Sequence, residues 1–211
     1  MIDVSNLKDA LETLGFVAHG DIHEKVFPEI GCSLKVDFHA KKLIYPNEIK
    51  GRERNNGFDK KENFVVFECV CRLLSKGYRP EHIELEKEWH LGHDPKGGRA
   101  DICVTDTSGN MLFIIECKTW GREYDKALNN TKSDGAQLFS YWQQEQSCKW
   151  LVLYASDLKG GCIVHKASTI DCSDDANIVL LSKKDKSIKL YRDANTASAK
   201  YEAWKETYGR Q

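Results

Sequence analysis

The 211-residue sequence lacks the features that mark several special classes of protein. No apolar run approaches the roughly 18 residues of a membrane-spanning helix, and the N-terminus lacks the basic-then-apolar pattern of a secretory signal. There is no internal repeat, no low-complexity tract and no Cys-x-x-C pair of the kind that binds zinc. These absences predict a cytoplasmic protein that has no membrane partner.

What is present is typical of a globular protein, with 41% hydrophobic and 30% charged residues. The chain has eight cysteines, and several of them stand in apolar helix or strand contexts. We interpret them as reduced thiols of the core rather than as a disulfide framework or a metal site.

The net charge of −1 shows that the chain is not basic as a whole, although nucleic-acid binding needs only a local basic patch. The segment Lys41–Lys61 carries seven basic residues and is punctuated by Asn and Gly. It is either a solvated loop or an arm that contacts phosphate groups, and the sequence leaves both readings open.

Two regions can be distinguished along the chain. Residues 1–60 form an accessory N-terminal region, with a short helix over 7–14, a hairpin of strands near 33–39 and 43–45, and the basic loop. Residues 61–211 form the main domain. Its expected elements are a helix over 64–74, strands at 82–90, 99–105, 111–118 and 150–154, a helix over 132–146, further strands at 161–165, 178–181 and 188–191, and a final helix at 197–208.

This order of helix, three strands, helix and strand predicts an α/β fold, with a mixed sheet flanked by helices.

The central hairpin carries the most informative residues. Glu116 and Lys118 are two residues apart on one strand, so both side chains face the same side of the sheet. The preceding strand brings Asp101 alongside through a Ser-Gly-Asn turn. Two acids and a lysine at the end of a hairpin are the minimum parts of a Mg²⁺ site for phosphodiester hydrolysis.

We therefore expect Mg²⁺ to be held by Asp101, Glu116 and the backbone carbonyl of Cys117, with Lys118 orienting or deprotonating the attacking water. A second pattern lies on the next helix. Gln137 and Tyr141 are four residues apart and share a helix face, where they would touch DNA phosphates or support the metal ligands. An ordinary amphipathic helix explains the same spacing.

Asp101 and the Glu116-Cys117-Lys118 tripeptide resemble the motif of the PD-(D/E)xK nucleases, although Ala100 stands where the motif has proline. The Gln-x-x-x-Tyr pattern is similar to that of their RecB-type and type I restriction members. Further segments resemble the N-terminal nuclease domain of type I restriction-enzyme R subunits over residues 63–156. They are Asn63–Glu68, Gly77-Tyr78, Ile83–Glu86, Gly98–Ile102 and Ile115–Gly121.

The resemblance implies a restriction-endonuclease-like αβββαβ core and a Mg²⁺-dependent DNA endonuclease in which Mn²⁺ can substitute. It also implies double-stranded DNA as substrate, and motor, methylase and specificity parts as partners. No G-x-x-x-x-G-K-[ST] loop is present, so ATP would act only through a motor domain absent from this chain. We expect the chain to be one domain of a longer restriction polypeptide.

The resemblance also suggests further site residues. This family often carries another acid near the metals, for which Glu68 on the preceding helix is a candidate. Glu86 and Glu88 share a strand face beside the hairpin, and either could be an outer metal ligand or could hold Lys118. Arg99 is a candidate for DNA binding or for support of the site.

Three other readings stay open. The Glu116–Lys118 pair could be a surface salt bridge, which contributes little to stability. The domain could be a non-catalytic module of nuclease ancestry that binds DNA or a partner. The same chemistry could also serve a resolvase or an RNA-cutting enzyme of the same fold.

Overall fold

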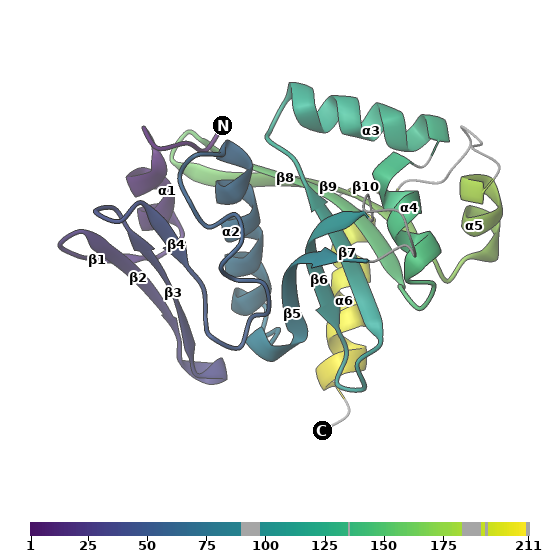
Figure 1. Ribbon diagram of the computed structural model, residues 1–211, viewed down its shortest axis with the longest axis horizontal. Helices are drawn as coiled ribbons and strands as arrows, with labels where there is room; N and C mark the ends of the chain where they lie inside the picture. Colours follow the sequence, from purple (N-terminus) through teal and green to yellow (C-terminus); the bar gives the residue numbers. More distant parts are fainter. Residues whose placement is uncertain (90–97, 135, 183–190, 193, 210–211) are drawn as a thin grey trace.

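The computed structural model describes residues 1–89, 98–134, 136–182, 191–192 and 194–209 of the chain (Figure 1). The N-terminal region contains one helix and a four-stranded antiparallel sheet in the order β1-β2-β3-β4. Its elements are α1 (Leu7–Thr13), β1 (Val17–His19), β2 (Ile22–Phe27), β3 (Cys32–Asp37) and β4 (Lys42–Ile44).

The predicted hairpin of the N-terminal region is confirmed as β3 and β4, which pair with Val36 opposite Leu43. The hairpin of β1 and β2 was not predicted, because His19, Asp21 and the turn at Gly20 interrupt its apolar pattern. Buried side chains of this sheet join those of α1 and of the following helix in one hydrophobic core. The boundary near residue 60 stays a prediction.

The main sheet follows, with strands in the order β10-β9-β8-β7-β6-β5 (Figure 1). Neighbouring strands of this sheet pair antiparallel, except that β7 and β8 are parallel and are joined through two helices. The elements are α2 (Lys61–Ser75), β5 (Ile83–Glu88), β6 (Arg99–Thr105), β7 (Met111–Cys117), α3 (Arg122–Asp134), α4 (Ala136–Gln144), β8 (Trp150–Lys159), β9 (Cys162–Asp171), α5 (Asp175–Ser182), β10 (Tyr191–Arg192) and α6 (Ala194–Tyr208). The predicted α/β class, a mixed sheet flanked by helices, is confirmed.

Helices cover both faces of this sheet, and the alternation of strand residues decides which face each side chain joins. Ile115 of β7 belongs to the core beneath α2 and α6, whereas its neighbour Ile114 belongs to the core beneath α3 and α4. Strand β7 is buried along its whole length, as its apolar sequence predicts. The side chain of a charged residue on this strand therefore lies in the interior of the protein.

Two predicted elements were wrong. The expected strand at 178–181 is part of α5, because a short apolar run fits either a strand or a buried helix turn, and Asp174 favours the helix. The Asp174 carboxylate accepts a hydrogen bond from the backbone N–H of Ala176 (2.9 Å), which caps the helix start. The single helix expected over 132–146 is two helices, α3 and α4, and α3 begins ten residues earlier than predicted.

The start of α3 was not predicted because the segment is rich in charged and Asn residues, and few of its described side chains, such as Tyr124, Leu128 and Thr131, are buried. Of the strand expected at 188–191, residues 188–190 lie outside the described residues. Strand β9 extends well beyond the predicted 161–165. None of the helices in the described part of the chain is long and apolar enough to cross a membrane.

The cysteines agree with the core interpretation, because all eight are free thiols and five of them are buried. The basic segment 41–61 is attached to the edge of the main sheet. Lys50 bridges β5, donating its N–H to the Ile83 carbonyl (3.2 Å) and accepting from the Leu85 N–H (2.8 Å). Gly51 has φ +72°, and a Cβ atom there would lie 2.0 Å from the Leu85 carbonyl oxygen. Only glycine fits this approach, so the basic segment is held beside the central hairpin.

Candidate active site

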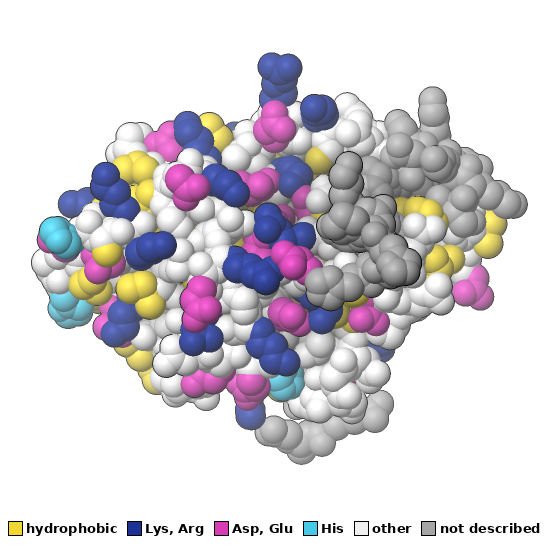
Figure 2. Space-filling model, in the orientation of Figure 1, with side chains coloured by type: hydrophobic (Ala, Val, Ile, Leu, Met, Phe, Trp, Pro, Cys, Tyr) yellow, Lys and Arg dark blue, Asp and Glu magenta, His cyan; other side chains and the backbone are white. Residues whose placement is uncertain are grey.

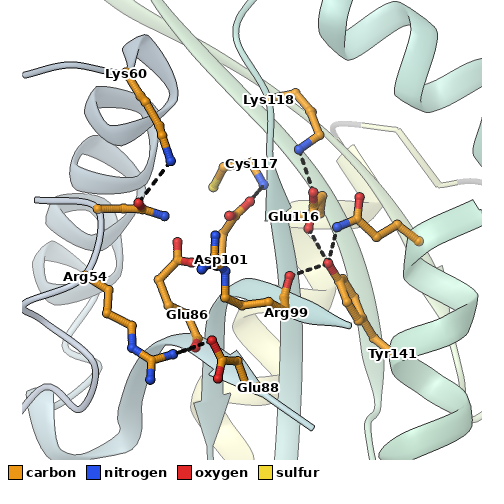
Figure 3. A network of polar contacts seen from close by, with 12 residues as sticks. Arg54, Lys60, Glu86, Glu88, Arg99, Asp101, Glu116, Cys117, Lys118 and Tyr141 are labelled. Atoms are coloured by element: carbon orange, nitrogen blue, oxygen red, sulfur yellow. Dashed lines mark hydrogen bonds and ion pairs between the residues drawn. The ribbon is translucent and has the colours of Figure 1, made fainter. Parts of the chain in front are cut away.

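Strands β6 and β7 bring the predicted acids together, as Figure 3 shows. The pairing of Ile102 with Ile115 places Asp101 beside Glu116 at the same end of the hairpin. The Asp101 Oδ2 atom accepts a hydrogen bond from the backbone N–H of Cys117 (2.7 Å). This bond fixes the Asp101 carboxylate against β7, so the two strands hold it in one position.

Lys118 lies between two carboxylates. Its Nζ atom is 2.5 Å from Glu116 Oε1 and 3.0 Å from Glu62 Oε1, and the lysine keeps about 21% of its side chain exposed. Glu116 is only 3% exposed. The Glu116–Lys118 pair is thus not the surface salt bridge that the sequence left open. It is an ion pair at the edge of the core, where an unpaired carboxylate would be costly.

The electrostatics of the cluster follow from burial and from the crowding of charges. Burial and then the Glu116 carboxylate raise the pKa of Asp101 well above its usual value. Burial also raises the pKa of Glu116, against the opposing effect of Lys118. Burial alone would lower the pKa of Lys118, but Glu116 and Asp101 outweigh it and raise this pKa. Ionised carboxylates are therefore unfavourable at this position, and a nearby cation stabilises them.

Gln137 and Tyr141 of α4 meet at this cluster, as their four-residue spacing predicts, and Figure 3 shows Tyr141 beside Glu116. The Tyr141 hydroxyl lies 2.9 Å from Glu116 Oε2 and 2.5 Å from the Arg99 carbonyl oxygen, and it accepts a hydrogen bond from the Gln137 amide. Tyr141 is fully buried and stacks on Trp89. Of the two roles expected for this pair, the position of the phenol fits support of Glu116 rather than contact with DNA.

The acids of β5 are held by arginines. Glu86 is buried, and its carboxylate pairs with Arg99 (2.5 Å), while Glu88 pairs with Arg54 (2.7 Å) from the basic segment. Glu86 has φ +54°, a left-handed conformation that is rare and strained for a residue other than glycine. The structure thus places Glu86, Glu88 and Arg99 next to the cluster without bringing either acid into contact with Lys118.

Glu68 lies apart from the cluster. One of its carboxylate oxygens accepts a hydrogen bond from Arg72 (2.7 Å) and the other from the Tyr154 hydroxyl (2.7 Å). Tyr154 pairs with Cys117 in the sheet and shares the α2 face, opposite to Glu116. The acid that α2 contributes to the cluster is Glu62 instead, which sequence reasoning missed. The signal that could have found it was its position as the acidic residue in the first turn of α2.

A cleft of about 310 Å³ opens on the cluster. Glu116, Lys118 and Gln137 line one wall, and α3 contributes Lys126 and Asn130 to the other. Figure 2 shows basic and acidic side chains interspersed across the middle of this face, over the region between α2 and the main sheet. Most side chains that line the cleft are charged or polar, and the cleft is open to solvent, so a charged substrate can enter it.

The donors present fit a hard cation. Two carboxylates and a main-chain carbonyl offer oxygen atoms only, and Mg²⁺ is commonly bound through one or two carboxylates with water as its other ligands. Burial raises the pKa values of Asp101 and Glu116 despite the neighbouring Lys118, so a bound cation would stabilise their ionised forms. Within the described ranges, no group of three or more His, Cys, Asp and Glu side chains stands in metal-binding geometry. Any ion here would need water ligands.

Comparison with known proteins gives this arrangement a context. A search of curated proteins finds no match to the chain. The model of the family described as Type I restriction enzyme R protein N terminus matches residues 62–171, which is more than half of the chain. The matched segment begins at Glu62 and contains the acidic hairpin, Lys118 and both helices that flank the cleft. The chain therefore belongs to the family of type I restriction enzyme R protein N-terminal domains.

Proposed function

We propose that this restriction-enzyme nuclease domain is a Mg²⁺-dependent DNA endonuclease of the PD-(D/E)xK superfamily, Gln-x-x-x-Tyr type, that hydrolyses phosphodiester bonds. The observation that carries the proposal is the meeting of Asp101, Glu116 and Lys118 at one end of the β6–β7 hairpin, where Glu116 and Lys118 line a solvent-open cleft. Family membership supports the coarser assignment to a restriction nuclease module.

Asp101, Glu116 and the Cys117 carbonyl would hold Mg²⁺, which supplies positive charge against the phosphoryl transition state and makes water a better nucleophile. Glu116 and Asp101 raise the pKa of Lys118 and keep it protonated, and this pKa would fall if a bound Mg²⁺ neutralised their charge. It can then orient the attacking water or take its proton. Tyr141 and Gln137 hold the Glu116 carboxylate in place.

Double-stranded DNA is the proposed substrate, and the cations around the cluster support it. Arg54 and Lys60 belong to the basic segment that Gly51 holds against β5 (Figure 3), and Lys126 lines the cleft from α3. Together they flank the acids on two sides, where phosphates on either side of the cut would lie. The motor, methylase and specificity parts of a type I system are the proposed partners, and ATP would act through the motor.

The test is cleavage of supercoiled and linear DNA with Mg²⁺ or Mn²⁺. Wild type should cut, and Lys118→Ala should cut at least about 100-fold more slowly, because it removes the group that handles the water. Lys35→Ala is the matched control: Lys35 is an exposed, ion-paired lysine on β3, remote from the cleft. Lys118→Ala and Asp101→Asn proteins that cut at the wild-type rate would reject the assignment.

One observation favours the alternative of a non-catalytic module. Lys118 already bridges Glu116 and Glu62, so the acids have a partner without any metal. Titration with Mg²⁺ separates the two functions: a nuclease site binds the ion more weakly in Asp101→Asn, whereas a docking module binds it equally in both proteins.

A further inference from the structure

A second cavity, of about 610 Å³, lies on the other face of the main sheet. Residues of α2, β7, β8, β9 and α6 line it. It is separate from the cleft because neighbouring residues of β7 face opposite ways: Ile115 lines this cavity, whereas Glu116 lines the cleft. Its volume is in the range of small-molecule sites.

Basic side chains dominate the charged lining of the cavity. Arg72, Lys76 and Lys200 all line it. The nearest acid, Glu68, has its two oxygens engaged by Arg72 and Tyr154. The negative charge of Glu68 is thus balanced by Arg72, and two ammonium groups are left over.

Of these two lysines, Lys200 of α6 lies in the less favourable environment for a positive charge. Its ammonium lies over the Tyr154 ring, 5.4 Å from the ring centre. No carboxylate of the described residues lies within ion-pair distance of it. Burial lowers the pKa of Lys200, as expected for an ammonium held without a counter-ion. Such a group destabilises the empty protein and would be stabilised by an anion.

The remaining lining is aromatic and rich in donors. Tyr201 and Trp204 contribute aromatic rings beside the Tyr154 ring, which lies under Lys200. The buried Trp204 Nε1 atom has no hydrogen-bond partner in the part of the chain that the structure describes. Aromatic faces accept planar rings, and an indole N–H can only donate. The cavity therefore suits a ligand with a planar ring and an acceptor-rich, negatively charged group.

We propose that this cavity binds a nucleoside monophosphate, with its base among the aromatic side chains and its phosphate at Lys200 and Lys76. A phosphate monoester carries nearly two negative charges at neutral pH, which matches the two uncompensated lysines. The ligand is either a free nucleotide or the phosphorylated end of a DNA strand. Because this site lies on the opposite face from the cleft, it does not depend on the proposed nuclease activity.

The experiment is isothermal titration calorimetry of the full chain in EDTA, which keeps metal out of the cleft. The probes are AMP and dAMP, adenosine and inorganic phosphate as partial ligands, and a 5′-phosphorylated oligonucleotide. We expect AMP or dAMP to bind one-to-one and more tightly than either partial ligand. Lys200→Met should weaken binding at least roughly tenfold, because it removes a charged hydrogen-bond partner at constant volume. Lys35→Met, at a partly exposed position of β3, should bind as wild type does.

Thermal unfolding distinguishes loss of the site from loss of the fold. Lys200→Met should melt at or above the wild-type temperature, because it removes a partly buried ammonium that has no carboxylate partner among the described residues. If it melts lower, Lys200→Arg, which keeps the charge, must bind within a few-fold of wild type. The proposal is overturned if wild type binds none of the nucleotide probes, or if Lys200→Met binds them as tightly as wild type. Binding of the oligonucleotide but not of AMP or dAMP would identify a DNA end as the ligand.

Discussion

Replacing Tyr141 by Phe tests whether α4 positions the candidate site. The change removes one oxygen atom and keeps the ring that stacks on Trp89. The lost hydroxyl lies 2.9 Å from Glu116 Oε2 and accepts a hydrogen bond from Gln137. Because Tyr141 is fully buried, water cannot replace the hydroxyl without rearrangement.

The expected loss can be worked out from these contacts. A hydrogen bond to a charged group contributes about 1.5–3 kcal/mol to stability. For a chain of this size, a loss of about 2 kcal/mol lowers the melting temperature by roughly 4–8 °C. The Tyr141 hydrogen bond also lowers the pKa of Glu116, so its removal raises that pKa further. Ionised Glu116, and with it cleavage, should then need a higher pH.

Two assays measure these effects: thermal unfolding near neutral pH and the pH dependence of DNA cleavage. Tyr45→Phe is the matched control. Tyr45 is buried, but its hydroxyl has no hydrogen-bond partner among the described residues, so its removal should leave stability equal or higher. The acidic limb of the cleavage profile should move to higher pH in Tyr141→Phe only.

The reasoning would be refuted if Tyr141→Phe unfolded at the wild-type temperature and kept the wild-type pH profile. A loss of stability with an unchanged profile would show that Tyr141 supports the fold but not Glu116. Equal losses in Tyr141→Phe and Tyr45→Phe would show that the ring environment, rather than the hydroxyl, decides the result.

Two further predictions concern stability. Burial and Glu116 raise the folded-state pKa of Asp101 above its unfolded value, so its charged form costs stability once the pH exceeds that unfolded value. Asp101→Asn in EDTA should therefore melt above wild type near neutral pH, with a gain that vanishes in acid; a lower melting temperature near neutral pH would contradict this. Gly109 has φ +85° and open space around it, so Gly109→Ala should lower the free energy of unfolding by about 1–2 kcal/mol from backbone strain alone. Gly51→Ala should lower it by at least about 1 kcal/mol more, because its Cβ meets the Leu85 carbonyl. Equal losses of both variants in chemical denaturation would show that the basic segment is not held against β5.

The parts of the site that could be predicted from the sequence are local ones. Glu116 and Lys118 lie two residues apart on a strand, and Gln137 and Tyr141 four apart on a helix, so their relative directions follow from the element itself. Asp101 joins them through a short hairpin turn, whose geometry is also local. Most residues of the cluster could thus be predicted to meet because they lie close together in the chain.

The contribution of α2 could not be predicted in the same way. Glu62 and Glu68 both flank its apolar stripe, and only the rotation of the helix against the sheet decides which acid reaches Lys118. That rotation depends on packing against residues far away in the sequence, including the N-terminal sheet. The apolar run Ile178–Leu181 was predicted as a strand because four consecutive apolar residues carry no helical periodicity.

The attachment of Lys50 to β5 has a consequence for how this domain can meet other proteins. An uncovered outer strand offers free N–H and C=O groups to any extended peptide, which is a common route to assembly and to misassembly. Here Lys50 already occupies the outward N–H of Leu85 and the outward carbonyl of Ile83. Strand addition is blocked at this border, so neighbouring subunits that approach it would have to dock through side chains.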